Sequence, residues 1–249
     1  MRKAHWIVGL MLSAGFAATP VAAAQTAVAV AANFTAPVEE IAAAFTAKTG
    51  DTIELSFGAT GALYTQITQG APFTVFLAAD NKRPTTAVKE GFGVDGTVFT
   101  YAIGKSALYS PSLDVTDGKA VLEANGFAHL AIAEPTAAPY GAAAMEVLGK
   151  LGIADAVAPK IVTGENISQT LQFIDSANAE LGFVALSQVV GKPASQVWIV
   201  PADLYTPILQ DAVLLKTGEN DAVAKAFVDF LQGEEAHAII EKYGYQIAD

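Results

Sequence analysis

The feature that most constrains this chain is an alternation of strand-like and helix-like segments. Four short apolar runs are each followed by a helical pattern, and they span residues 26–32, 53–57, 129–133 and 160–163. In the first pattern, Val38, Ile41, Ala42 and Phe45 stand at positions i, i+3, i+4 and i+7, and Gly50 then ends the helix. A repeated order of strand and helix predicts an α/β fold with a largely parallel sheet.

Two stretches of the chain indicate crossings between two domains. Residues 99–109 form a long strand-like segment with Gly104 in its middle, where a glycine suits a bend. Residues 181–185 and 201–208 are typical of a return crossing. The last helical patterns carry apolar faces, which favours their packing against the first domain.

The start of the chain has the form of an export signal. Arg2 and Lys3 precede an apolar stretch at residues 7–16, and small alanines at 22–24 form a cleavage site after Ala24. The apolar stretch is too short for a spanning helix, so we expect export and release rather than an anchor. The expected division is a signal peptide at 1–24, a first lobe at 25–101 plus 206–249, and a second lobe at 102–205.

The charge balance of the mature chain excludes several kinds of partner. Without residues 1–24 it has 12 basic against 25 acidic residues, a net charge of −13, so nucleic acid and anionic membranes are poor partners. The sequence contains no cysteine, which excludes disulfides, thiol catalysis and thiolate metal sites. Stability must therefore come from packing, which a chain of this length can supply.

A glycine-bracketed turn lies between a predicted strand and a predicted helix. Gly58 and Gly61 flank Ala59 and Thr60, which places Thr60 as a helix N-cap beside unpaired backbone N–H groups. Such a turn suits a small anion. From residue 56 to residue 80 the chain has no Lys, Arg or His, so neutral dipoles would hold that anion.

Four helix starts follow predicted strands, at residues 33–35, 59–61, 139–141 and 166–168. In open α/β sheets such loops gather at the carboxyl ends of the strands, where ligands bind. Each loop by itself is explained by ordinary capping, but four loops divided between two lobes favour a cleft. There Asn33 has an amide and Thr60 a hydroxyl to donate, and the ring of Tyr140 is a wall or a lid.

Catalytic and metal-binding patterns are weak in this sequence. The mature chain has only His129 and His237, and neither belongs to a known catalytic motif. Asp80 suits a carboxylate ligand or a helix N-cap, and we favour the cap. Tyr243 and Tyr245 resemble only faintly the tyrosine pair of ferric-ion carriers. We therefore expect no enzyme, no cofactor and no site for a metal cation.

Several motifs, over nearly the whole mature chain, resemble one known family. They are AANF, SFGATGALYTQI, the spaced residues GAP, VF and AAD, then PYG and LGFVAL. This order is similar to that of the periplasmic molybdate-binding proteins of ABC importers. The resemblance implies a two-lobed periplasmic-binding-protein fold of type II, whose lobes are mixed, mostly parallel sheets flanked by helices. It also implies a monomer that binds an oxyanion in the cleft between the lobes and docks on the permease of an ABC importer at the inner membrane.

The resemblance also implies which residues hold the ligand. They are Ala32, Asn33, Thr60, Tyr140 and, through its backbone N–H, Ile167. Some members of the family have serine where Asn33 and Thr60 stand, and a tyrosine where this chain has Ala185. The expected ligand is molybdate, and tungstate with it. The alternatives are another oxyanion such as sulfate or phosphate, ferric iron, or the substrate of an exported hydrolase.

Overall fold

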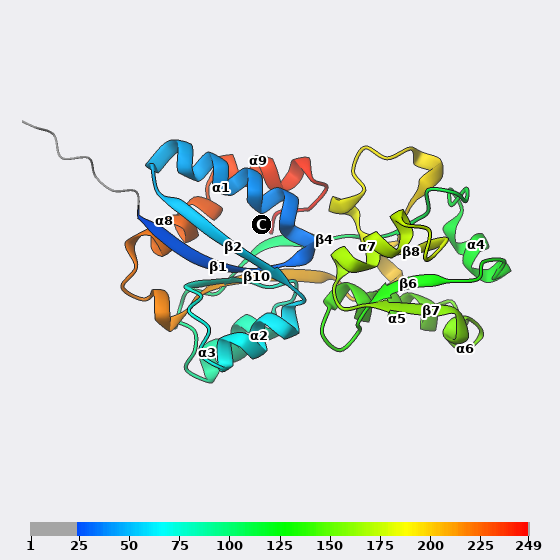
Figure 1. Ribbon diagram of the computed structural model, residues 1–249, viewed down its shortest axis with the longest axis horizontal. Coiled ribbons are helices and arrows are strands. Elements are labelled where there is room, and N and C mark those ends of the chain that lie inside the picture. The colour runs from blue at the N-terminus through cyan, green and yellow to red at the C-terminus, as the bar shows by residue number, and fades with distance from the viewer. Residues whose placement is uncertain (1–23, 249) are drawn as a thin grey trace, which may run out of the picture.

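The structure is a computed structural model that describes residues 24–248. It has two lobes that lie side by side, each built on a five-stranded sheet (Figure 1). The predicted signal peptide lies outside the described residues, apart from Ala24. No helix of the described part is long and apolar enough to span a membrane.

The first sheet has the strand order β2-β1-β3-β10-β4. Its strands are β1 (Gln25–Ala31), β2 (Thr52–Gly58), β3 (Val75–Leu77), β4 (Phe99–Gly104) and β10 (Ile208–Leu214). The second sheet has the order β7-β6-β8-β5-β9. Its strands are β5 (Ser106–Tyr109), β6 (Leu130–Ala133), β7 (Ile161–Gly164), β8 (Leu181–Ala185) and β9 (Val197–Ile199).

The two sheets share one pairing pattern. In each, the first three strands in spatial order are parallel, and the last two pair antiparallel. The antiparallel strand next to the parallel three, β10 or β5, is the one that enters from the other lobe. The predicted α/β class with two lobes is confirmed, and each sheet is mixed.

The chain crosses between the sheets twice. The segment predicted as one long strand over 99–109 is two strands, because β4 ends at Gly104 and β5 begins at Ser106 in the other sheet. A side chain at Gly104 would collide with the hydroxyl of Tyr140. The return lies between β9 and β10. The lobe boundaries given above stay a prediction.

Helices cover both faces of each sheet. Those of the first lobe are α1 (Thr35–Thr49), α2 (Thr60–Thr68), α3 (Lys82–Lys89), α8 (Ala222–Leu231) and α9 (Glu234–Lys242). Those of the second are α4 (Gly118–Ala124), α5 (Pro139–Lys150), α6 (Ala154–Val157) and α7 (Ile167–Asp175). Single 3₁₀ turns are η1 (Ala32–Phe34), η2 (Ala158–Lys160), η3 (Leu186–Gln188), η4 (Ala194–Gln196), η5 (Ala202–Leu204) and η6 (Lys216–Gly218).

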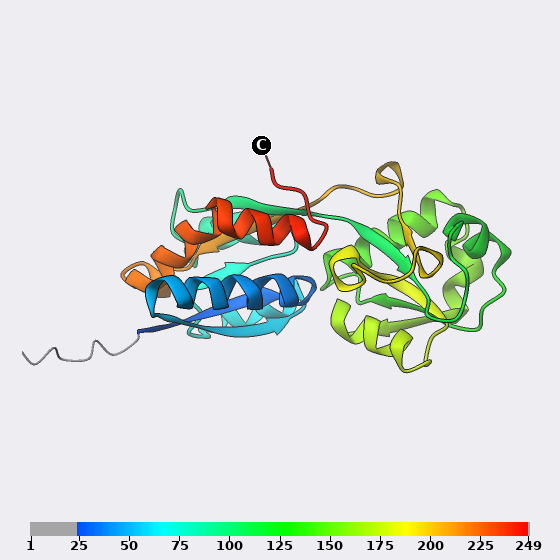
Figure 2. The ribbon, with the colours of Figure 1, turned by 90° about the horizontal axis from the view of Figure 1, so that it is seen from above.

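The core of the first lobe follows from alternation along the strands. Val28 and Val30 of β1 face α1, α8 and α9, whereas Ala29 between them faces α2 on the opposite side. The predicted face of α1 is buried, with Phe45 against rings of α8. Figure 2 shows α8 and α9, in orange and red, beside the blue α1. The last helices therefore pack against the first lobe, as predicted.

Candidate functional site

A small cavity lies between the lobes, where four loops meet. Its volume is only about 10 Å³. The first lobe contributes Ala31, Ala32, Asn33, Gly58, Ala59, Thr60 and Ala79, and the second contributes Ala138, Pro139, Tyr140, Asn166 and Ile167. The five residues predicted as ligand contacts all line this cavity. That they bind a ligand stays a prediction.

Topology explains why these loops converge. In the first lobe, η1 follows β1 and α2 follows β2, and the two strands are parallel. In the second, α5 follows β6 and α7 follows β7, again from parallel strands. The carboxyl ends of parallel strands lie at one edge of a sheet, which brings each pair of helix starts together.

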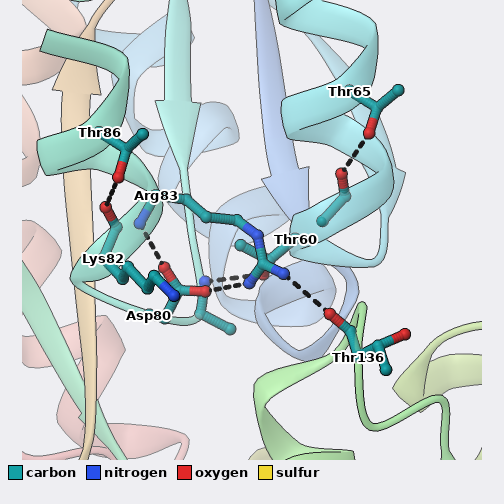
Figure 3. Close-up of polar contacts among 9 residues, drawn as sticks. Thr60, Thr65, Asp80, Lys82, Arg83, Thr86 and Thr136 are labelled. Atoms are coloured by element: carbon teal, nitrogen blue, oxygen red, sulfur yellow. Dashed lines mark hydrogen bonds and ion pairs between the residues drawn. The ribbon is translucent and has the colours of Figure 1, made fainter. Parts of the chain in front are cut away.

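Thr60 is placed differently from the prediction. The N-cap of α2 is Ala59, in extended conformation, and Thr60 is the first helical residue with no capping bond from its side chain. Its Oγ1 instead accepts a hydrogen bond of 3.0 Å from the backbone N–H of Ala79, just after β3 (Figure 3). A hydroxyl that accepts still has its own hydrogen to donate. Thr60, which lines the cavity, therefore keeps a hydrogen that it can donate.

The side chain of Asn33 does not have the role predicted for it. Its Nδ2 donates to Oε1 of Gln210 at 2.5 Å and to the hydroxyl of Tyr245 at 2.9 Å. Because an amide nitrogen has two hydrogens, neither remains for a ligand. Sequence reasoning missed this because both partners lie more than 170 residues away along the chain.

The backbone of Asn33 is held by the same group of residues. Its carbonyl oxygen lies 2.8 Å from the hydroxyl of Tyr245 and 2.9 Å from that of Ser187, in the second lobe. We call Asn33, Ser187, Gln210 and Tyr245 the buried contact, since all four are buried. Of its three new members, the sequence had drawn attention only to Tyr245, as one of two neighbouring tyrosines.

Tyr140 is the second residue of α5, directly after Pro139. It is buried, and its hydroxyl makes no hydrogen bond among residues 24–248. Burial, with Tyr245 nearby, raises the pKa of Tyr140 well above its ordinary value, so the phenol stays neutral. The hydroxyl end packs against Gly104. The ring is thus a wall of the site that also reaches the first lobe.

Unpaired backbone N–H groups point to an anion. The helices α2, α5 and α7 begin at the cavity, and the first N–H groups of a helix have no partner within it. Among residues 24–248, the N–H groups of Thr60, Tyr140 and Ile167 donate to no backbone carbonyl. Asn166 caps α7 as predicted. Its side chain accepts from the N–H groups of Ser168 and Gln169 and not from that of Ile167. The positive ends of three helix dipoles therefore meet here.

The cavity itself carries no formal charge. Within the described part of the chain, no Lys, Arg, His, Asp or Glu lines it. An ion pair between Asp80 and Arg83 lies behind Thr60, and sequence reasoning missed it as a feature of the site. Asp80 also accepts from the backbone N–H of Arg83 at 2.8 Å and so binds the first turn of α3, although the N-cap residue itself is Asn81 and not Asp80 as predicted. Residues 24–248 contain no cluster of three or more His, Asp or Glu suited to a metal ion.

Comparison with known proteins places the chain in a family. Residues 26–246 match the family of bacterial extracellular solute-binding proteins. The molybdate-binding protein ModA of Rhodobacter capsulatus is 56% identical over 228 residues, which are 92% of this chain and 90% of that protein. ModA of Azotobacter vinelandii is 52% identical over 238 residues, 94% of each chain.

A solved structure agrees with these relatives. The Azotobacter vinelandii periplasmic molybdate-binding protein matches with a TM-score of 0.86 and 39% identity, over 90% of this chain and 100% of that one. The resemblance stated from the motifs is confirmed. These relatives are binding proteins, so the protein is not an enzyme. By its sequence and by its fold, the chain belongs to the bacterial extracellular solute-binding proteins and, among them, to the molybdate-binding ModA family.

Proposed function

We propose that this protein captures molybdate in the periplasm, as a monomer without a cofactor, and delivers it to an ABC importer at the inner membrane. Export would follow cleavage of the signal peptide after Ala24. The observation that carries the proposal is the chemistry of the cavity, where helix N-termini from both lobes and the hydroxyl of Thr60 surround an uncharged space. Groups that only donate hydrogen bonds suit a ligand that only accepts them.

The proposed contacts are Ala32, Asn33, Thr60, Tyr140 and Ile167. Thr60 would donate through its hydroxyl and its backbone N–H, and the other residues through backbone N–H groups. The amide of Asn33 would act indirectly, because its bonds to Gln210 and Tyr245 hold the η1 turn in place. The phenol of Tyr140 would form a neutral wall.

Neutral donors can hold a dianion tightly. Burying a charge costs free energy unless its oxygens find hydrogen-bond donors. A hydrogen bond to a charged group contributes about 1.5–3 kcal/mol, so roughly six would supply tight binding after ordering costs are subtracted. Arg83 adds little net charge because Asp80 pairs with it.

The same donors explain selectivity. Hydrogen phosphate carries a proton that would find no acceptor, and such a buried unsatisfied group costs about 1–3 kcal/mol. Sulfate is a bare dianion, so size must exclude it, since a smaller ion cannot reach donors on both lobes together. Tungstate has the charge and shape of molybdate, and we propose that it binds as well.

Titration calorimetry on residues 25–249 tests this function with molybdate, tungstate, sulfate, phosphate and ferric citrate. We expect tight binding of the first two alone. Sub-micromolar binding of sulfate without molybdate would overturn the proposal in favour of another oxyanion.

The variant Thr60→Val tests the site, because it keeps the shape and removes the hydroxyl. We expect about tenfold weaker molybdate binding or more. Thr65→Val is the matched control, since Thr65 is exposed on the same helix and its hydroxyl donates to the carbonyl of Gly61 (Figure 3). Equal affinities of the two variants would remove Thr60 from the site.

A further inference from the structure

A second set of contacts joins the lobes beside the cavity, at the start of α2. Arg83 of α3 is held by its ion pair with Asp80, and its Nη2 donates to the carbonyl of Thr136 in the second lobe at 3.0 Å (Figure 3). The backbone N–H of Gly61 donates to the carbonyl of the next residue, Ala137, at 2.9 Å. Two adjacent carbonyls of one lobe are therefore bound by two donors of the other.

These bonds attach to the residues that form the cavity walls. Gly61 directly follows Thr60, and Ala137 directly precedes Ala138 and the start of α5. Arg83 itself does not line the cavity. It therefore acts on the site only by holding the two walls against each other.

The identity of residue 61 supports this reading independently. Gly61 lies inside α2 without a left-handed backbone, so its conformation does not require glycine. Alanine is the better helix former at such a position. A Cβ there, however, would lie 2.9 Å from Nη2 of Arg83 and 3.1 Å from Cα of Ala137. Glycine at this position is explained by the close approach of Arg83 and the second lobe.

We infer that Arg83 is a positioning residue that latches the lobes over the bound ligand and so sets how long the ligand stays. The inference rests on the proposed function and deepens it. Association requires open lobes, so loss of the latch leaves that step no slower. Dissociation requires the bonds to Thr136 and Ala137 to break, so the latch slows it.

The experiment measures dissociation of radiolabelled molybdate after a chase with unlabelled molybdate. For Arg83→Gln we expect dissociation about fivefold to tenfold faster, with association no slower than in the wild type and the melting temperature little changed. Lys89→Gln is the matched control, because it removes the same charge from an exposed position on the same helix. A dissociation rate for Arg83→Gln within twofold of the control would overturn the inference.

Gly61→Ala separates the latch from a role in folding. We expect unchanged or higher thermal stability, because alanine favours the helix, together with faster dissociation, because the methyl group separates the lobes. Lower stability with an unchanged dissociation rate would contradict the latch.

A readout without ligand keeps this inference distinct from the proposed function. The chain has no cysteine, so Lys225→Cys in the first lobe and Asp155→Cys in the second, both exposed, allow a specific pair of spin labels. We expect Arg83→Gln to shift the distances between the labels toward more open lobes. If the wild type fails to bind molybdate but this shift occurs, the proposed function is wrong and the latch stands. If the label distances in the ligand-free protein do not shift and the dissociation rate does not change, the latch is refuted.

Discussion

Two of the contacts between the lobes near the cavity, the buried contact and the Arg83 contact, use different chemistry. The buried contact consists of the neutral groups of Asn33, Ser187, Gln210 and Tyr245. Ser187 belongs to the second lobe and the other three to the first, where Gln210 and Tyr245 lie beside the crossing strands. The Arg83 contact uses an ion pair whose side chains are 24% and 18% exposed. It also faces a hollow lined by Tyr64 and Glu146, through which water reaches it.

The difference teaches where this fold tolerates charge. A fully buried ion pair pays a large desolvation cost, whereas a pair at a rim pays less and contributes less. At these two contacts neutral groups therefore occupy the interior and charges the rim, and no charged residue lines the cavity. Breaking the buried contact leaves polar groups without a hydrogen-bond partner where water cannot reach them. At the rim, water can replace a lost partner.

The largest effect is expected from Asn33→Leu, which breaks the buried contact at its centre. It removes two donors and leaves Oε1 of Gln210 without its partner, so we expect a loss of about 2–4 kcal/mol in the free energy of unfolding. Urea denaturation measures this. In the control Asn178→Leu, which removes an exposed amide that donates to Ser176, the change should stay within about 0.5 kcal/mol. Similar losses in the two variants would show that burial is not what distinguishes them.

A smaller effect is expected from Tyr245→Phe, which keeps the ring and removes one hydroxyl of the buried contact. Asn33 and Ser187 each lose a partner, so we expect a cost of about 1–2 kcal/mol in urea denaturation. Tyr243→Phe is the control, because the hydroxyl of Tyr243 bonds Glu40 near the surface, and it should cost less than about 0.5 kcal/mol. If Tyr243→Phe cost more, the ranking of interior over rim would be wrong.

The smallest effect is expected from added salt, which acts on the rim alone. Screening weakens the partly exposed Arg83 contact, so molybdate should leave up to about twofold faster at high salt. Arg83→Gln should lose this dependence. Association should speed slightly, because the net charge of −13 on the mature chain repels the anion less. A steep slowing of association with salt would contradict the uncharged site.

Local sequence patterns predicted most of the architecture. The apolar periodicity of α1 and the glycine at residue 104 both mark features that the structure contains, because the periodicity determines the buried helix face and the glycine marks the crossing between the lobes. The four loops of the site were also foreseen, since parallel strands bring their carboxyl ends to one edge whatever their exact register.

The errors concern hydrogen-bond partners. The local sequence around Thr60 is that of an N-cap, yet its hydroxyl accepts from the backbone N–H of Ala79. Asn33 donates both amide hydrogens to Gln210 and Tyr245. Local sequence ranks what a side chain can do. It does not show which distant residue the fold places within hydrogen-bond distance.

By itself, then, the sequence determined the α/β class, the crossing near Gly104, the loops that form the cavity and the family. These depend on periodicity, turn chemistry and motif spacing, all of which act over a few residues. Only the tertiary structure decided that Arg83 reaches Thr136 and that Ser187 and Tyr245 hold Asn33. Such contacts join residues that are far apart in the chain, and they form only when both lobes pack and exclude water between them.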